Sequence, residues 1–318
     1  MDTRYLKSLI AVVESGSIAH AARIEGLTAA AVSQRILALE RQLGFELLSR
    51  VGHAARPSQA CLGLLPRAKR IVRETALLAG DADVGGLTGQ LKIGAISTVL
   101  TGLLPGALRA LTERAPGLKP VIVPGTSRSL YQALLSGDVD AAILVAPPFE
   151  LPKALRAVSL RKEPLVFLSQ EKSSASIPAQ LQSQPYIRYD PDAWGGRHAE
   201  EYLADHGLKP TPLVDLDALE TIAMLVTGGL GVSLVPYWSG FEQWGHKCAV
   251  SQIGNDRYDR EVALISPAQT DRPNMISALC EALATAQPDR ANPPSTCPEP
   301  PQGRQLSVSR SHCESARG

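Results

Sequence analysis

Three consecutive polar residues, Ser33, Gln34 and Arg35, form the first group whose types and spacing could do chemistry. They lie between Val32 and Ile36, which share the apolar face of a predicted helix, so we place the polar group on the opposite face. A Gln side chain can pair bidentately with the edge of adenine, and an Arg side chain with that of guanine. Each such pair contributes about 1–3 kcal/mol of discrimination between bases. The alternative for Gln34 is a solvated side chain on a helix surface.

A second group consists of hydroxyl residues where predicted helices follow predicted strands. Helix N-termini at the carboxyl ends of strands direct free N–H groups at ligands, and they favour negative charge. We therefore predict a pocket for a small carboxylate, which Arg128 and Arg197 are candidates to assist and to which the turn Gly229–Gly231 can contribute. A helix cap explains each hydroxyl individually, so the pocket rests on the set as a whole. The set is Ser97, Thr98, Thr101, Thr126, Ser127 and Thr221.

The chain lacks the motifs of common enzyme classes. It contains no Gly-x-Ser-x-Gly elbow, no phosphate-binding Gly-x-x-x-x-Gly-Lys-[Ser/Thr] loop and no His-Glu-x-x-His pair. His198 and His206 are eight positions apart and cannot share a metal ion on one helix. The five cysteines include no Cys-x-x-Cys pair, and Cys61 is interpreted as a buried thiol rather than a redox-active one. We predict a protein that is not an enzyme and uses neither a metal nor a cofactor.

The elements that must position the first group occupy residues 1–57. Apolar residues recur at helical spacing, with Ser17 and Thr28 as N-caps of the second and third helices and Gly26 as the stop between them. Two short helices joined by a Gly-containing turn form a helix-turn-helix. The short pattern from Gly44 to Pro57 fits a small β-wing after the third helix. Residues 1–57 are therefore predicted to form a winged helix-turn-helix domain.

A longer helix is predicted from Ser58 to about Ala79. Its apolar residues return about every 3.5 positions, which is typical of a seam for another helix and predicts dimerisation. Pro66 lies inside this helix and is expected to bend it. The following stretch, Gly80–Gly89, has four glycines and two aspartates and is predicted to be a hinge. Residues 58–86 are assigned as linker helix and hinge.

After Gln90 the predicted strands alternate with helices, a pattern that indicates βαβ units and a mostly parallel sheet over residues 87–287. Residues 288–318 are rich in Pro and Ser without apolar periodicity, and they are predicted to be a disordered tail. Residues 1–79 hold eleven Lys or Arg against six Asp or Glu, although the whole chain carries only +1. This basic bias favours a polyanionic partner for the N-terminal part, with uneven surface charge as the alternative.

No apolar run approaches the roughly 18 residues of a membrane span, and Leu9–Val13 is shorter than the roughly 7–15 residues of a signal-peptide core. We therefore expect a cytoplasmic protein without a membrane partner.

The string from Leu6 to Arg50 resembles the DNA-binding domain of LysR-type transcriptional regulators. The resemblance rests on three ungapped groups: Gly16-Ser17 before Ala21-Ala22, Val32-Ser33 with Ile36, and Leu39-Glu40 with Leu43-Gly44. After Arg50 the family's Leu-Thr-x-x-Gly becomes Pro57–Cys61, and Leu48 stands where an aromatic residue is usual. The resemblance implies that the helix from Thr28 to about Leu39 enters the major groove of double-stranded DNA. The alanines there can offer only methyl contact to thymine, or they are simply good helix formers. The assigned DNA-binding residues are Ser17, Thr28, Ala29, Ala30, Ser33, Gln34, Arg35, Arg50 and Arg56.

The second half resembles the family's effector-binding domain, a two-lobed α/β fold like that of solute-binding proteins. The resemblance rests on the strand and helix pattern, on Gly137–Asp140 and on Gly228–Val232. It implies a chain that crosses between lobes near Arg161–Glu163 and returns near Ser266-Pro267. Lobe 1 then comprises about 90–161 and 267–287, and lobe 2 about 162–266. The predicted fold class is α+β multidomain.

The resemblance also implies a homodimer through the linker helix and a homotetramer on an interrupted inverted repeat, responding to a small effector. A rival class is a metabolite-binding protein whose N-terminal helices serve only as a protein-interaction module. A small hydrolase or transferase is a third class, but its nucleophile is lacking. The basic bias of residues 1–79 and the polar group Ser33–Arg35 favour DNA over the rival.

Overall fold

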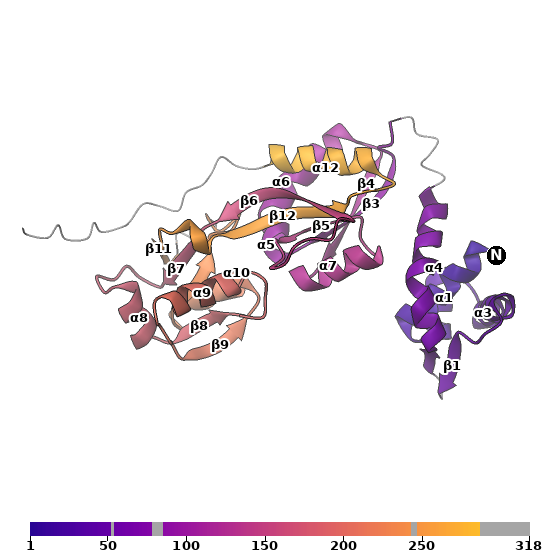
Figure 1. The fold of residues 1–318 in the computed structure, drawn as a ribbon, viewed down its shortest axis with the longest axis horizontal. Helices are drawn as coiled ribbons and strands as arrows, with labels where there is room; N and C mark the ends of the chain where they lie inside the picture. Colours follow the sequence, from indigo (N-terminus) through magenta and orange to yellow (C-terminus); the bar gives the residue numbers. More distant parts are fainter. Residues whose placement is uncertain (52–53, 78–84, 243–246, 287–318) are drawn as a thin grey trace, which may run out of the picture.

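The computed structural model describes residues 1–51, 54–77, 85–242 and 247–286, without the side chains of residues 50, 51, 54, 73, 76 and 77. The predicted hinge therefore lies largely outside the described residues, as does the tail at 288–318. Figure 1 shows the N-terminal elements and the linker helix at one end of the molecule, followed by two lobes. Within the described helices, none is long and apolar enough to cross a membrane.

The N-terminal domain is a winged helix-turn-helix, as predicted. Asp2, Ser17 and Thr28 cap its three helices, and each side chain accepts a hydrogen bond from a backbone N–H of the first turn. Gly16 and Gly26 end the first two helices with positive φ angles of 67° and 65°, which a side chain would strain. The elements are α1 (Thr3–Ser15), α2 (Ile18–Glu25), α3 (Ala29–Leu43) and the antiparallel wing strands β1 (Leu48–Val51) and β2 (Ala54–Pro57).

The linker helix α4 (Gln59–Leu77) continues through Pro66. One face packs on the N-terminal domain, where Cys61 and Ala68 are buried together with Leu9 of α1. Leu62 remains 47% exposed. The predicted seam is therefore divided between two faces of α4: Ala68 already has a partner within the chain, whereas Leu62 is available to another helix.

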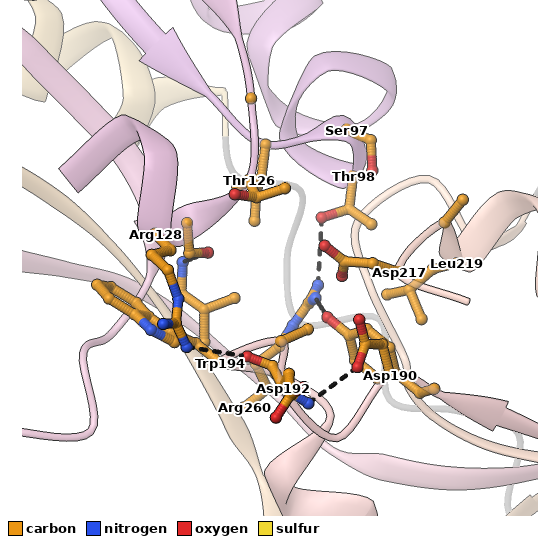
Figure 2. A pocket seen from close by; sticks show the side chains of 18 of the residues that line it. Ser97, Thr98, Thr126, Arg128, Asp190, Asp192, Trp194, Asp217, Leu219 and Arg260 are labelled. Carbon is orange, nitrogen blue, oxygen red and sulfur yellow. Dashed lines mark hydrogen bonds between the residues drawn. The ribbon is translucent and has the colours of Figure 1, made fainter. Parts of the chain in front are cut away.

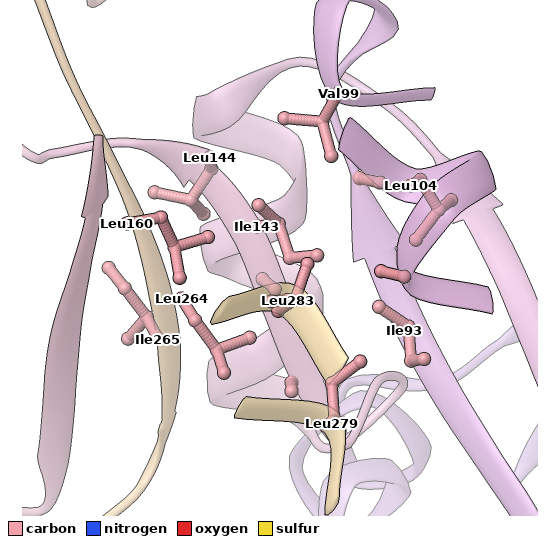
Figure 3. Packing of buried hydrophobic residues seen from close by; sticks show 14 of the residues in the cluster. Ile93, Val99, Leu104, Ile143, Leu144, Leu160, Leu264, Ile265, Leu279 and Leu283 are labelled. Carbon is pink, nitrogen blue, oxygen red and sulfur yellow. The ribbon is translucent and has the colours of Figure 1, made fainter. Parts of the chain in front are cut away.

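Lobe 1 is built on a five-stranded mixed sheet of order β4-β3-β5-β12-β6. Its parallel strands are β3 (Gly89–Ala95), β4 (Leu118–Pro124) and β5 (Ala141–Val145), and the antiparallel additions are β12 (Arg260–Pro267) and β6 (Leu155–Glu163). The helices are α5 (Ser97–Thr101), α6 (Leu103–Arg114), α7 (Ser127–Ser136) and α12 (Pro273–Thr285). Figure 3 shows Leu279 and Leu283 of α12 packed with Ile93 and Ile143 of the sheet. This apolar layer holds the carboxyl ends of β3 and β4 in place.

Lobe 2 has an antiparallel sheet of order β10-β7-β11, and a parallel pair β8-β9 that a bridge from Tyr186 to Val232 joins to β10. The strands are β7 (Leu165–Ser169), β8 (Tyr186–Tyr189), β9 (Pro212–Leu216), β10 (Ser233–Pro236) and β11 (Ala249–Gln252). The helices are α8 (Ile177–Ser183), α9 (Arg197–Asp205), α10 (Leu219–Thr227) and the 3-10 turn η1 (Asp256–Tyr258).

Two features of the effector-binding half differ from expectation. The sheets are not mostly parallel: β6 and β12 form a long antiparallel pair in the lobe 1 sheet, and β7 of lobe 2 pairs antiparallel with β10 and β11. The outward crossing after Glu163 lies where predicted, but the return lies near Arg260 instead of Ser266-Pro267. The reason is that β12 pairs with β5 and β6 from its first residues, so residues 260–266 belong to the lobe 1 sheet.

An ionic contact joins the linker helix to lobe 1. Lys69 Nζ of α4 lies 2.7 Å from Asp138 Oδ1 in the turn after α7, and 2.9 Å from Glu14 Oε1 of α1. Ser136 Oγ donates to the other oxygen of Asp138 at 2.7 Å. These two hydrogen bonds and the charge of Lys69 hold the pKa of the Asp138 carboxyl below its usual value, although burial opposes them.

Candidate functional site

A cavity of about 670 Å³ lies between the two lobes. Figure 2 shows Thr98 pointing toward the guanidinium of Arg260, with Asp217 and Asp190 on the lobe 2 side. The polar lining from lobe 1 is Ser97, Thr98, Thr126, Ser127, Arg128 and Arg260, and that from lobe 2 is Tyr189, Asp190, Asp192 and Asp217. Trp194 forms part of the apolar wall.

The deepest part of the cavity is held by a buried ion pair. Arg260 and Glu163 are both 2% exposed, and Arg260 Nε donates to Glu163 Oε2 at 2.8 Å while its Nη2 also contacts the same oxygen. The remaining donors reach Thr98 Oγ1 at 3.2 Å and Tyr189 Oη at 3.4 Å. Ser239 N of lobe 2 donates to Glu163 Oε1 at 3.2 Å, so one carboxylate ties the end of β6 to the second lobe.

The lobes also meet at Gly102, which lies between α5 and α6. A Cβ at Gly102 would overlap the backbone carbonyl of Ser239, so only glycine allows this approach. Thr101, which we expected in the ligand pocket, instead donates to Glu220 Oε1 of α10 at 3.1 Å. Its hydroxyl therefore joins the lobes outside the cavity, because α5 has turned away from the strand end by that position.

The two hydroxyls after β4 lie at the cavity, as predicted. Thr126 caps α7 and accepts from Ser129 N at 3.2 Å, and Ser129 Oγ accepts from Thr126 N to complete a capping box. Ser127 is buried, and its Oγ accepts from Val145 N at 3.2 Å. Both hydroxyls thus have structural partners and still line the cavity, together with the exposed Arg128.

Thr221 was expected at the cavity, but it is exposed on α10 and does not line it. The cavity reaches only the start of that helix, at Ala218 and Leu219. The expected turn Gly229–Gly231 is also absent from the lining, because it packs against Gln170 and Pro185. Arg197 is likewise not among the lining residues.

Sequence reasoning missed the acidic residues of lobe 2. Asp190 follows β8 and Asp217 follows β9, so the strand-end rule that selected the lobe 1 hydroxyls would also have found them. Burial and the negative charge of Asp190 raise the pKa of the Asp217 carboxyl. Within the described part of the chain, no group of His, Cys, Asp or Glu is arranged to hold a metal ion.

The DNA-facing candidates gather on α3 and the wing. Thr28, Ala29, Ala30 and Gln34 are exposed along α3, and Ser33 is partly buried. Ser17 is partly buried at the start of α2, and Arg56 is exposed on β2. Arg50 lies in β1, and its side chain is outside the described ones.

Arg35 departs from the predicted exposed face. Its side chain is 23% exposed, and its Nη1 donates to Ser8 Oγ at 3.1 Å and to Glu25 Oε2 at 3.4 Å. Ser8 also donates to Glu25 Oε2, at 2.6 Å. The guanidinium therefore joins three helices, because its long side chain reaches back across the groove between α1 and α2.

We expect Arg35→Ala to lower the unfolding free energy of the N-terminal domain by about 1–3 kcal/mol, since it leaves Ser8 and Glu25 without their shared partner. Thermal unfolding followed by circular dichroism of Arg35→Ala and of the exposed neighbour variant Gln34→Ala measures the effect. Equal midpoints for the two variants would contradict it.

Comparison with known proteins identifies both halves. The model for "Bacterial regulatory helix-turn-helix protein, lysR family" matches residues 3–62, and that for "LysR substrate binding domain" matches residues 85–288. The HTH-type transcriptional regulator IlvR of Caulobacter vibrioides is 30% identical over 244 residues, which cover 74% of this chain and 82% of IlvR. A probable hydrogen peroxide-inducible genes activator of Mycobacterium leprae is 31% identical over 246 residues, which cover 73% of this chain and 76% of that protein.

Solved structures share the whole fold. A full-length OxyR variant from Pseudomonas aeruginosa superimposes with a TM-score of 0.68 at 23% identity, covering 89% of this chain and 94% of OxyR. Full-length CbnR in complex with its target DNA gives a TM-score of 0.64 at 20% identity, covering 90% of this chain and all of CbnR (100%). The matched models cover the helix-turn-helix and most of the two lobes, so the chain belongs to the LysR family of DNA-binding transcriptional regulators, which carry an effector-binding domain and are not enzymes.

Proposed function

We propose that this regulator binds promoter DNA as a homotetramer and that a small carboxylate-bearing effector in the inter-lobe cavity changes its shape on DNA. The exposed start of α3 carries the DNA-binding part of the proposal. There Gln34, Ala29 and Ala30 are exposed, so their side chains can reach a major groove. Arg56 on the wing, and by position Arg50, are suited to phosphate contact.

The effector part is supported by the cavity between the lobes. The hydroxyls of Ser97 and Thr126 and the start of α7 face it from lobe 1, with Arg128 beside them. Backbone N–H groups of a first helical turn and an exposed guanidinium are suited to a carboxylate group. Glu163 and Gly102 both contact Ser239 of lobe 2, so a ligand bound between the lobes can alter their relative orientation.

A salt titration of duplex binding tests DNA recognition. The proposal predicts a linear fall of log K with log salt concentration, with a slope of about −0.9 for each phosphate contacted. A duplex from the chain's own promoter region should bind more tightly than a scrambled duplex at every salt concentration. Equal, weak binding of both duplexes would instead favour the protein-interaction module.

Gln34→Ala is expected to weaken binding to the specific duplex by about 1–3 kcal/mol, with little change for the scrambled one, because a bidentate adenine contact is lost. Because this side chain is exposed, the substitution should leave the stability of the domain unchanged. Fluorescence anisotropy at one fixed salt concentration measures both affinities. Arg41→Ala, an exposed position near the other end of α3, is the matched control. A Gln34→Ala affinity equal to that of the control would remove Gln34 from the recognition set.

A further inference from the structure

The inter-lobe cavity carries more negative than positive charge. Its charged lining consists of Arg128, Arg260, Asp190, Asp192 and Asp217. Arg260 is paired with Glu163, which Arg161 also approaches at 3.4 Å. The donors of Arg260 are engaged by Glu163, Thr98 and Tyr189, so this guanidinium is less available to a ligand than that of Arg128. Three carboxylates therefore face one available guanidinium, that of Arg128.

The acidic residues are not neutralised from within the described part of the chain. Asp190 Oδ1 accepts only from Asp192 N, at 2.9 Å, in a turn that neutralises no charge. Arg128 Nη2 approaches the backbone carbonyl of Asp192 at 3.5 Å rather than a carboxylate. The described ion pairs include none with Asp190, Asp192 or Asp217. Like charges close together in a partly desolvated cleft favour a cationic ligand.

The two sides of the cavity differ in chemistry. Lobe 1 contributes hydroxyls, the start of α7 and Arg128, whereas lobe 2 contributes Asp190, Asp192 and Asp217. Trp194, 8% exposed, supplies an aromatic wall and is held by ring contacts with Tyr131 at 5.7 Å and Phe149 at 5.6 Å. In Figure 2 this ring lies beside Arg128, so it borders the lobe 1 side of the cavity. Burial and the neighbouring Asp190 raise the pKa of Asp217, and the positive charge of Arg260 opposes them only in part.

We propose that the effector is a small zwitterion of the amino-acid type, whose protonated nitrogen binds Asp217 and Asp190 of lobe 2 while its carboxylate binds lobe 1. The inference rests on the proposed effector function of this cavity, and it adds a protonated nitrogen to the proposed carboxylate ligand. One ligand that satisfies both sides holds the lobes together. A carboxylate without the nitrogen would add a fourth negative charge to the cleft.

Matched compounds test the proposal on the full chain. Each set contains an L-amino acid, the carboxylic acid that lacks its amino group, and the amine that lacks its carboxylate, with small, branched, acidic and basic side chains among the sets. Thermal shift at pH 7.5 finds the compounds that bind, and calorimetry measures Kd. We expect at least one amino acid to bind at least about tenfold more tightly than its des-amino analogue, a difference of about 1.4 kcal/mol.

Asp217→Asn should weaken binding of that amino acid at least about tenfold and leave binding of the des-amino acid unchanged or tighter. Asp215→Asn is the control: Asp215 lies two residues before Asp217, on β9, pairs with Arg188 at 2.8 Å and does not line the cavity. The Asp215→Asn variant should bind the amino acid with unchanged affinity. Retained DNA binding by both variants excludes misfolding as the cause.

Two results would overturn the zwitterion and leave the carboxylate pocket standing. They are a des-amino acid that binds as tightly as its amino acid, and tighter binding of the amino acid itself after Asp217→Asn. Absence of binding by every compound at 10 mM, about the highest practical concentration, also contradicts it. Thr98→Val addresses the proposed function separately: if it leaves Kd unchanged for every compound that binds, the lobe 1 site is wrong, whatever Asp217 does.

Discussion

Glu163→Gln is expected to lower the unfolding free energy of the effector-binding domain by about 3–5 kcal/mol. The substitution keeps the size of the side chain but removes the charge opposite Arg260, which is 2% exposed. A guanidinium left in this environment loses hydration without gaining an opposite charge. The decrease in unfolding free energy should therefore exceed the contribution of an ordinary hydrogen bond, which is about 1 kcal/mol.

Urea unfolding followed by tryptophan fluorescence measures this effect, because all three tryptophans lie between residues 194 and 244. A double variant, Glu163→Leu with Arg260→Met, separates charge from packing. Because apolar residues of similar volume replace a buried pair at little cost, the double variant should be more stable than Glu163→Gln. A Glu163→Gln loss below about 1 kcal/mol would show that Arg260 finds another anion or water.

The helix boundaries of the N-terminal domain could be predicted because they depend on local chemistry. Ser17 and Thr28 accept the predicted cap hydrogen bonds, and Gly26 takes the predicted left-handed conformation. Each feature involves residues close in the chain, so spacing alone identifies it. The apolar stripe of α3 through Val32 and Ile36 is likewise buried as expected.

Arg35 shows where local reasoning stops. Its position between buried turns of α3 predicted exposure, but its partners are Ser8, 27 residues away, and Glu25, 10 residues away. Helical periodicity describes which face a Cα occupies, not where a long, flexible side chain ends. The antiparallel pair β6-β12 was missed for a related reason. The residue pattern of one strand does not identify a partner strand about a hundred residues away.

The candidate pocket was half predictable. The strand-end rule correctly placed Thr98, Thr126 and Ser127 at the cavity, but it was applied to hydroxyls, and in lobe 2 it selected Thr221 instead of the acidic residues. Applied to every predicted strand, it would have named Asp190 and Asp217 and changed the expected ligand charge. No sequence pattern marks Arg260 as the partner of Glu163, because the pair forms only when the two strands between the lobes are in register.

His198 should make the stability of the effector-binding domain depend on pH. It is 8% exposed on α9, it has Arg197 Nε as a neighbour at 3.4 Å, and its Nδ1 has no hydrogen-bond partner among the described residues. Burial, followed by the charges of Arg197 and Arg260, lowers its pKa from 6.5 to about 4. Between pH 4 and 6.5 the unfolded chain therefore binds more protons than the folded one, and the unfolding free energy rises with pH. The contribution, about 3 kcal/mol, is present above pH 6.5 and lost as pH falls to 4.

Carboxyl groups also titrate in this window, so the test is the difference between variants. Urea unfolding at pH 4.5 and 7 is expected to give a smaller stability difference for His198→Gln than for the unmodified chain. His20→Gln, at an exposed position on α2, is the control and should leave the pH dependence of the tryptophan-monitored transition as it is. Identical pH dependence for all three proteins would mean that His198 reaches solvent or an anionic partner in the folded state. If His20→Gln keeps the steep pH dependence of the unfolding free energy and His198→Gln loses it, the proton uptake lies at His198, because the carboxyl groups that titrate in this range are present in both variants.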